Sequence, residues 1–160
     1  MSPMNISIYT DGGCSGNPGP GGWAYVYVVD KAGQPEILSE KSGAEAFTTN
    51  NRMELMAVIS GLEGLSAPDA PDIGYAAAVT VYTDSQYVQK GISVWIKTWK
   101  KNEWRNSSKE PVKNRDLWEK LDELAGRFPV IWKWVKGHAG DVFNEHCDFM
   151  TQRAIASLKI

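Results

Sequence analysis

Cysteines and long apolar runs are scarce in this sequence. Only two cysteines, Cys14 and Cys147, occur among 160 residues, and without a sign of secretion they predict free thiols rather than a disulfide. No run approaches the ~18 apolar residues of a membrane-spanning helix. The first five residues lack the basic stretch and apolar core of a signal peptide. These absences predict a cytoplasmic protein that does not enter a membrane.

Internal repeats and low-complexity segments are also absent. Apolar residues make up 42% of the chain and charged residues 22%, the usual mixture for a globular protein. A chain of this length can bury a real core as one domain. We therefore expect a single domain over residues 1–160, and we expect it to act as a monomer.

A strong overall charge is missing as well. The formal net charge is −2, which gives little general attraction to a polyanion. The segment 90–115, however, has a local charge of +6 and leaves −8 for the rest of the chain. Against Glu103 and Glu110 it sets eight basic residues, Lys90, Lys97, Lys100, Lys101, Arg105, Lys109, Lys113 and Arg115. Such a polarised surface can direct a polyanion to one side of the molecule.

Hydrophobic periodicity predicts the elements of the fold. Apolar alternation or short apolar runs predict strands at 5–10, 23–30, 36–43, 77–83 and 130–135. Helical spacing predicts helices at 50–65, 84–90, 94–101, 114–128 and 143–158. Two segments read as loops, the Gly- and Pro-rich stretch 12–22 and the polar, charged stretch 102–113.

The order of these elements is β-β-β-α-β-α-α-α-β-α. Three consecutive strands form an antiparallel meander, and strands separated by helices extend the sheet in parallel. We therefore expect an α/β fold with one mixed sheet and helices on its faces. The first and fourth strands should be parallel neighbours.

Two aspartates follow these neighbouring strands. Asp11 comes after the first strand and Asp84 after the fourth, at the edge where open α/β sheets bind their ligands. Carboxylates at short range repel each other unless a cation or a proton intervenes. The pair therefore predicts a metal site.

Two further acids are expected at the same edge. Glu54 lies in the first turn of a helix, in line with its buried stripe, and Asp148 flanks the apolar line of the last helix. Oxygen ligands alone suit Mg²⁺ or Mn²⁺ better than zinc. Two such ions about 4 Å apart are an established arrangement for phosphodiester cleavage. Asp11, Glu54, Asp84 and Asp148 are therefore candidate metal ligands and catalytic residues.

Each acid also has a structural interpretation. Asp84 can cap the helix after it, and Glu54 can complete a capping box that starts at Asn51. Asp11 before two glycines is typical of a turn, and Asp148 can be an ordinary boundary residue. Taken singly, these interpretations are the more frequent ones. The convergence of all four acids on one edge favours the metal site.

Polar residues near the acids can contact a nucleic acid. An amide can donate to and accept from a 2′-hydroxyl, and a helix N-terminus attracts phosphate. The candidate substrate-binding residues of this kind are Asn17, Thr49, Asn50, Asn51, Arg52 and Gln86. The alternatives are that Asn50 is a plain N-cap and that Gln86 is a solvated helix residue.

Aromatic and basic residues alternate after residue 94. Trp95 and Trp99 are four residues apart, and Trp104 follows Lys100 and Lys101. Tryptophan rings and lysines together can grip sugars and phosphates. Alternatively, the rings pack this segment onto the domain and the lysines form a solvated face. We expect both to hold, with Trp95 mainly structural and the lysines contacting a strand backbone.

A histidine between glycines, His138, precedes the helix that carries Asp148. Histidine titrates near neutral pH and can carry a proton to or from water or a leaving oxygen. We therefore expect His138 to be catalytic. The other histidine, His146, reads as a surface residue of the last helix.

Several segments together resemble the ribonuclease H family, in particular its bacterial type 1 enzymes. The matching segments lie in the family's order at 9–12, 16–22, 49–55, 83–88, 135–140 and 144–148. The resemblance covers nearly the whole chain.

The resemblance implies a five-stranded sheet in the order 3-2-1-4-5, with strand 2 antiparallel and helices on both faces. It implies Mg²⁺-dependent cleavage of the RNA strand of RNA–DNA hybrids, which leaves 5′-phosphate and 3′-hydroxyl ends. It assigns the metal sites to the four carboxylates, proton transfer to His138, and a DNA-gripping basic protrusion to residues 92–113.

Two other functions compete with this one. A hybrid-binding module without turnover would lack one or more carboxylates. A DNA-processing nuclease of the same fold would lack Asn17, Gln86 and the basic protrusion. All of these features are present, which favours the hybrid nuclease.

Overall fold

The structure is a computed structural model that describes residues 4–66, 76–135 and 141–158. The elements in chain order are β1 (Met4–Cys14), β2 (Gly19–Lys31), β3 (Gln34–Thr48), α1 (Asn50–Gly64), β4 (Ala76–Thr83), α2 (Gln86–Lys90), the π-helical turn η1 (Gly91–Trp95), α3 (Ile96–Lys101), α4 (Arg115–Ala125), β5 (Val130–Trp134) and α5 (Val142–Ala156). No helix of the described ranges is long and apolar enough to cross a bilayer.

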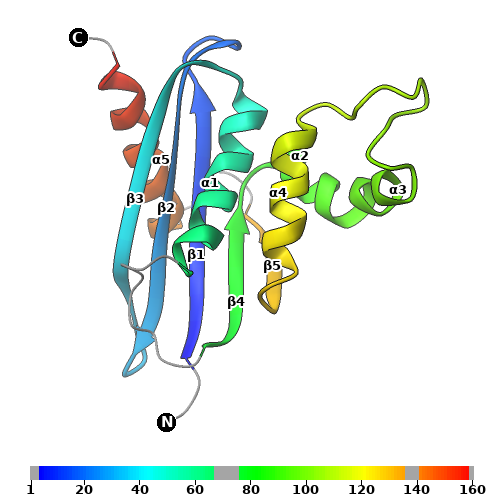
Figure 1. The fold of residues 1–160 in the computed structure, drawn as a ribbon. Coiled ribbons are helices and arrows are strands. Elements are labelled where there is room, and N and C mark those ends of the chain that lie inside the picture. Colours follow the sequence, from blue (N-terminus) through cyan, green and yellow to red (C-terminus); the bar gives the residue numbers. More distant parts are fainter. Residues whose placement is uncertain (1–3, 67–75, 136–140, 159–160) are drawn as a thin grey trace.

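The five strands form one sheet in the order β3-β2-β1-β4-β5 (Figure 1). β2 pairs antiparallel with β1 and β3, while β1–β4 and β4–β5 are parallel pairs. This confirms the expected mixed sheet, its strand order and the parallel contact between the first and fourth strands.

Helices cover both faces of the sheet, as expected (Figure 1). On one face Ile6 and Ile8 of β1 are fully buried in a cluster with apolar residues of α1 and α4, among them Leu62 and Trp118. On the other face Cys147 of α5 packs into a smaller cluster with two valines of β2. Strand alternation sends neighbouring side chains to opposite faces, so both helical layers are fixed by the same strands.

The expected loop at 12–22 is wrong. β1 continues to Cys14 and β2 begins at Gly19, so only residues 15–18 form the turn. Gly12, Gly13, Gly21 and Gly22 belong to the β1–β2 ladder, with Gly13 opposite Gly22, whereas Gly16 lies in the turn. Glycine here serves close packing rather than chain reversal, because a Cβ on Gly22 would press on Thr151 of α5. Composition alone does not separate these two uses.

The expected break between two helices, near residue 91, is also wrong. α2, η1 and α3 follow one another from Gln86 to Lys101 without a gap. Gly91 keeps helical dihedral angles, φ −59° and ψ −47°. A Cβ there would overlap the ring of Trp118, so this glycine is present for packing.

The helix expected over 114–128 is shorter in the structure. α4 ends at Ala125, so Phe128 packs against the core from the connection to β5. Asn114 occupies the N-cap position but makes no side-chain capping hydrogen bond. Its φ of +62° is left-handed, a conformation that asparagine tolerates better than most residues.

Candidate active site

Asp11, on β1, and Asp84, directly after β4, lie at matching positions of two neighbouring strands. In the parallel register Tyr9 pairs with Tyr82, and each aspartate follows its tyrosine by two residues. The two tyrosine rings stack with centroids 4.4 Å apart. Thr10 adds a hydrogen bond from its hydroxyl to the Tyr82 carbonyl, at 2.7 Å. The strand pair therefore brings both carboxylates to one edge of the sheet.

Glu54 approaches this edge because Gly12 has no side chain. A Cβ on Gly12 would overlap the backbone of Met53 and of Glu54 itself. The close contact between β1 and the start of α1 places the half-buried Glu54 beside Asp11, which is only 8% exposed. The Ser85 hydroxyl donates a hydrogen bond to the Glu54 carboxylate.

Asp148 comes from α5, on the other face of the sheet. The thiol of the preceding residue, Cys147, donates to the Tyr9 carbonyl at 3.2 Å. The Thr151 hydroxyl, one turn later, lies 3.5 Å from the Asp11 carbonyl and 3.0 Å from the Cys147 carbonyl. These contacts fasten α5 to β1 on both sides of the half-buried Asp148.

The acids interact electrostatically. Burial, followed by the charges of Asp84, Asp148 and Glu54, raises the pKa of Asp11 to about 8, against a lowering hydrogen bond from Thr151. Burial also raises the pKa of Glu54 to about 7, with a contribution from Asp84, while the Ser85 hydrogen bond opposes the shift. Close, poorly solvated carboxylates of this kind gain stability from a proton or a cation.

The donor set fits a hard divalent cation. All four side chains offer oxygen ligands, as Mg²⁺ prefers. In the described ranges no three His, Cys, Asp or Glu side chains stand close enough to enclose an ion by themselves. Mg²⁺ does not require such a cage, because it keeps several waters and commonly takes phosphate oxygens as ligands. The arrangement suits an ion shared with a phosphate.

The structural interpretations of Asp84 and Glu54 are wrong. Ser85 caps α2, since its side chain accepts from the Val88 N–H at 3.0 Å. Thr49 caps α1 by accepting from the Arg52 N–H at 3.3 Å, so Asn50 is not the N-cap either. The side chains that cap both helices are therefore hydroxyls, and neither acid is the N-cap of its helix.

Two of the expected substrate-binding residues meet beside the acids. The Asn50 N–H donates to the Asn17 side-chain oxygen at 3.2 Å, which joins the β1–β2 turn to the start of α1. Asn51 is half-buried, and Gln86 is exposed at the first position of α2. Asn17 thus lies in the turn after β1, Asn50 and Asn51 lie at the start of α1, and Gln86 begins α2 two residues after Asp84.

Arg52 is turned away from this group. Its guanidinium forms two hydrogen bonds with Asp116, at 3.1 and 2.8 Å, and one with Asn114, at 3.2 Å. Hydrogen bonding to Asp116 raises the pKa of Arg52. In the structure Arg52 therefore links α1 to α4.

The tryptophans of the basic segment pack against each other. Trp99 lies 5.8 Å from Trp95, 6.2 Å from Trp104 and 5.4 Å from Trp118 between ring centroids. All but the buried Trp118 are half-buried. These rings hold the segment against the main core, as the structural interpretation of Trp95 expected.

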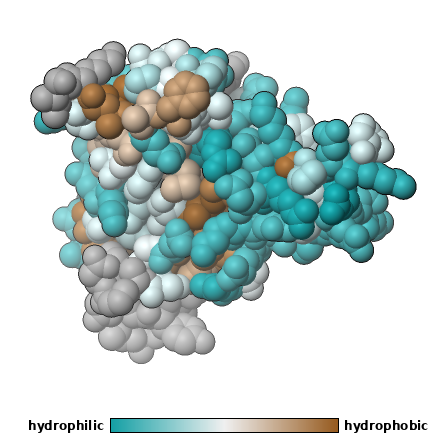
Figure 2. Space-filling view, turned by 45° about the horizontal axis from the view of Figure 1, so that its top comes forward, coloured by the Kyte–Doolittle hydropathy of each residue, from teal (hydrophilic) through white to brown (hydrophobic). Residues whose placement is uncertain are grey.

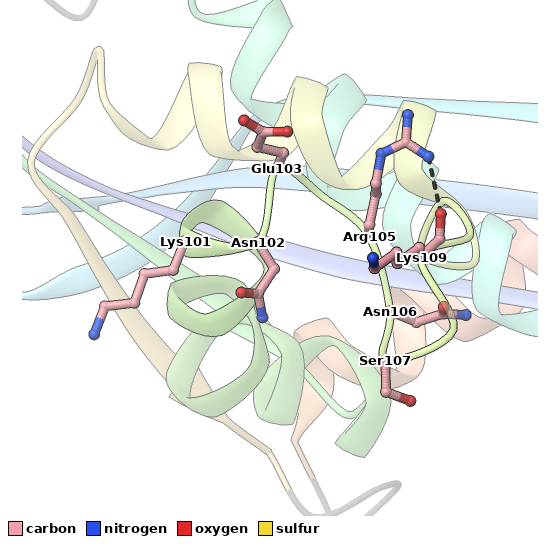
Figure 3. Close-up of a pocket in the computed structure, with 7 residues that line it drawn as sticks. All are labelled: Lys101, Asn102, Glu103, Arg105, Asn106, Ser107 and Lys109. Atoms are coloured by element: carbon pink, nitrogen blue, oxygen red, sulfur yellow. Dashed lines mark hydrogen bonds between the residues drawn. The ribbon is translucent and has the colours of Figure 1, made fainter.

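The lysines of the same segment differ in their surroundings. Lys100 forms an ion pair with Asp122 at 3.3 Å. Lys101 is exposed and points away from the other residues around a surface hollow (Figure 3), in which Arg105 donates to the Lys109 carbonyl at 2.9 Å. The surface over this part of the molecule is largely hydrophilic (Figure 2).

Of the two histidines, only His146 lies in the described part of the chain. His138 lies outside the described residues. His146 is half-buried on α5, and its Nε2 lies 2.5 Å from the Glu40 carboxylate on β3. It is a partly accessible helix residue, as expected, and it has an acidic neighbour.

Several residues that support the acids were not predicted from the sequence. These are Thr10, Ser85, Thr151 and Trp134, whose indole N–H donates to the Asp84 carbonyl at 3.3 Å. A usable signal existed for two of them, because hydroxyl residues directly flank the aspartates in Thr10-Asp11 and Asp84-Ser85. Thr151 and Trp134 are distant in sequence and depend on the tertiary fold.

Comparison with known proteins shows the family of this chain. The sequence profile of the RNase H family matches residues 3–156. The chain belongs to the RNase H family. A ribonuclease H of Treponema denticola is 55% identical over 157 residues, which cover 94% of this chain and 97% of that protein. A ribonuclease H of Legionella pneumophila (strain Corby) is 50% identical over 155 residues, covering 97% and 99%.

Solved RNase H structures share the fold. LC9-RNase H1, a type 1 RNase H with the type 2 active-site motif, superposes with a TM-score of 0.83 at 27% identity, covering 98% of this chain and 74% of that one. LC11-RNase H1, solved in complex with an RNA/DNA hybrid, gives a TM-score of 0.71 at 25% identity and covers 97% and 99%.

Proposed function

We propose that this RNase H hydrolyses the RNA strand of RNA–DNA hybrids at the sheet edge where Asp11, Glu54 and Asp84 meet. The observation that carries the proposal is the electrostatic coupling of Asp11 with Asp84, Asp148 and Glu54 in a buried position. Membership of the RNase H family and similarity to a hybrid-bound relative support the substrate.

Asp11, Glu54, Asp84 and Asp148 would hold divalent metal ions, with Mg²⁺ as the natural ion and Mn²⁺ as a substitute. Ions held by these four carboxylates would supply Lewis-acid chemistry for the attack of water on the scissile phosphate, with products that carry 5′-phosphate and 3′-hydroxyl ends. The protein supplies the rigid strand pair and the buried surroundings that keep the acids in place.

His138 is the proposed proton carrier. A histidine with an ordinary pKa can take a proton from water or give one to the leaving oxygen near pH 7. We expect His138→Ala to slow turnover by roughly 10²-fold without abolishing it. A completely inactive, folded variant would contradict a role limited to proton transfer.

The amides are the proposed readers of the RNA strand. Asn17 lies in the turn after β1, Thr49, Asn50 and Asn51 lie at the start of α1, and Gln86 begins α2. From these positions they can contact 2′-hydroxyls across the minor groove. Arg52 is paired with Asp116 and the tryptophans pack against one another, so contacts of their exposed parts with the hybrid would add to these structural roles. Lys100 and Lys101 would contact the DNA backbone.

A cytoplasmic, monomeric enzyme fits these observations. Cys14 and Cys147 are free thiols, which is the usual state of cysteine in a reducing compartment. Gel filtration with light scattering tests the oligomeric state, and a mass near 17.7 kDa is expected.

One assay separates the proposed function from its competitors. Labelled RNA–DNA, RNA–RNA and DNA–DNA duplexes are incubated with the protein, with Mg²⁺ or with EDTA. We expect only the RNA strand of the hybrid to be cut, and only with Mg²⁺. Equal cutting of all three duplexes would favour a DNA-processing nuclease, and binding without cutting would favour a hybrid-binding module.

A further inference from the structure

The residue after Asp84, Ser85, carries a hydroxyl that the proposed mechanism does not use. Ser85 is 3% exposed and follows Asp84 directly. A serine hydroxyl offers one donor and two acceptor positions. Ser85 uses the donor on the Glu54 carboxylate and an acceptor position on the Val88 N–H, at 3.0 Å. The hydroxyl therefore connects α1 to the start of α2.

The Ser85 backbone is held as well. Its N–H donates to the Thr83 hydroxyl at 3.1 Å, and the Thr83 carbonyl accepts from the Val135 N–H at 2.8 Å. With the backbone held and the hydroxyl oxygen accepting from the Val88 N–H, the hydroxyl hydrogen is directed to the Glu54 carboxylate. A donor with a fixed direction restricts the rotation of the carboxylate that accepts from it.

We propose that Ser85 is a positioning residue that orients the Glu54 carboxylate toward Asp11 and Asp84 and thereby sets the affinity of the site for Mg²⁺. The inference rests on the proposed metal site. Ser85 acts through Glu54 and touches neither the metal nor the substrate. A group that orients a metal ligand commonly changes metal affinity 10- to 100-fold when it is removed.

Metal binding without substrate tests this role. Isothermal titration of the 160-residue protein with MgCl₂ and with MnCl₂ gives the affinity of the site directly. We expect Ser85→Ala to weaken binding by about 10-fold. Ser93→Ala is the matched control, because Ser93 lies one helical segment later, is exposed and donates only to the Gln89 carbonyl at 2.7 Å. It should bind both ions like the wild type.

Ser85→Ala also removes the cap of α2, so a purely structural effect must be separated. The same substitution is therefore made in a Glu54→Gln background, where the carboxylate is already absent. If Ser85 acts through Glu54, Ser85→Ala has no further effect on Mg²⁺ affinity there. An equal loss in both backgrounds, or an unchanged affinity of the single variant, would overturn the proposal.

The outcome is distinguishable from a failure of the proposed function. If the wild-type protein binds neither Mg²⁺ nor Mn²⁺ and cuts no hybrid, the metal site itself is refuted. If the wild type binds and cuts but Ser85→Ala binds Mg²⁺ equally well, only the role of Ser85 is refuted. Circular dichroism at the titration temperature verifies that each variant is folded.

Discussion

At the scale of single residues, the missing side chain of Gly12 is as important as the acids. The backbone of β1 passes so close to the start of α1 that a Cβ on Gly12 would overlap Met53 and Glu54. Where two backbones approach this closely, a glycine cannot be replaced unless one backbone moves. The distance between Asp11 and Glu54 therefore depends on this residue.

Gly12→Ala is expected to push α1 away from β1. We expect a loss of about 1–3 kcal/mol in unfolding free energy, typical of overpacking, and a fall in Mg²⁺-dependent cleavage. Gly13→Ala is the matched control, because the nearest atom to a Cβ there is the Asn50 side-chain oxygen at 3.9 Å. Urea denaturation and hybrid cleavage measure both variants; equal effects would contradict the close-contact argument.

The raised pKa values of Asp11 and Glu54 give the metal-free protein a pH-dependent stability. Both folded values, about 8 and about 7, exceed the ordinary values of 3.8 and 4.5. Between pH 4 and pH 8 the folded state therefore binds more protons than the unfolded state, and stability falls as pH rises through that window.

We expect the unfolding free energy in EDTA to decrease by several kcal/mol, on the order of 5 kcal/mol, from pH 5 to pH 8. Mg²⁺ should reduce this decrease, because a bound cation offsets the repulsion that the protons relieve. Chemical denaturation at both pH values, with EDTA and with Mg²⁺, measures the effect. Stability that rises with pH in EDTA would contradict the buried, coupled acids.

At the scale of elements, the helical segment from α2 to α3 packs its tryptophans toward the core and exposes its lysines on the opposite side. Trp99 and its aromatic neighbours hold the segment to the core, while its lysines lie on the outer side. Lys100 is paired with Asp122, and Lys101 is exposed. The two lysines should therefore contribute unequally to the binding of a phosphate backbone.

Lys101→Ala is expected to weaken hybrid binding and to lower the slope of log affinity against log salt by about 1. Lys100→Ala should lower it less, because Asp122 already neutralises part of its charge. Lys31→Ala is the control, since Lys31 pairs with Glu36 at the far end of the β2–β3 hairpin. Salt titrations in EDTA avoid cleavage, and an unchanged slope for Lys101→Ala would exclude this contact.

At the scale of the whole molecule, the sequence predicted the strand order of the sheet and the parallel pairing of β1 with β4. Strand periodicity and the chain order of strands and helices are local properties, so the parallel contact of β1 with β4 followed from them. That contact alone predicts that Asp11 and Asp84 share an edge. The ribonuclease H resemblance supplied the substrate.

The wrong predictions at the glycines, a loop at 12–22 and a helix break near residue 91, have the same physical origin. The glycines near residue 12 and at residue 91 are present because backbone or rings pack against them, and this need arises from tertiary neighbours. The N-caps Thr49 and Ser85 were not predicted, because the adjacent Asn50 and Asp84 are equally suitable N-cap residues by type. Ser85 became significant only when α2 was placed against Glu54.

The central claim is that the coupled carboxylates carry Mg²⁺-dependent cleavage of the RNA strand. The most direct measurement compares wild type and Asp11→Asn for both cleavage and binding of a labelled RNA–DNA hybrid, in Mg²⁺ and in EDTA. We predict that the variant stays folded and binds the hybrid, while its cleavage rate in Mg²⁺ falls on the order of 10³-fold. Near-normal turnover by Asp11→Asn would contradict the account.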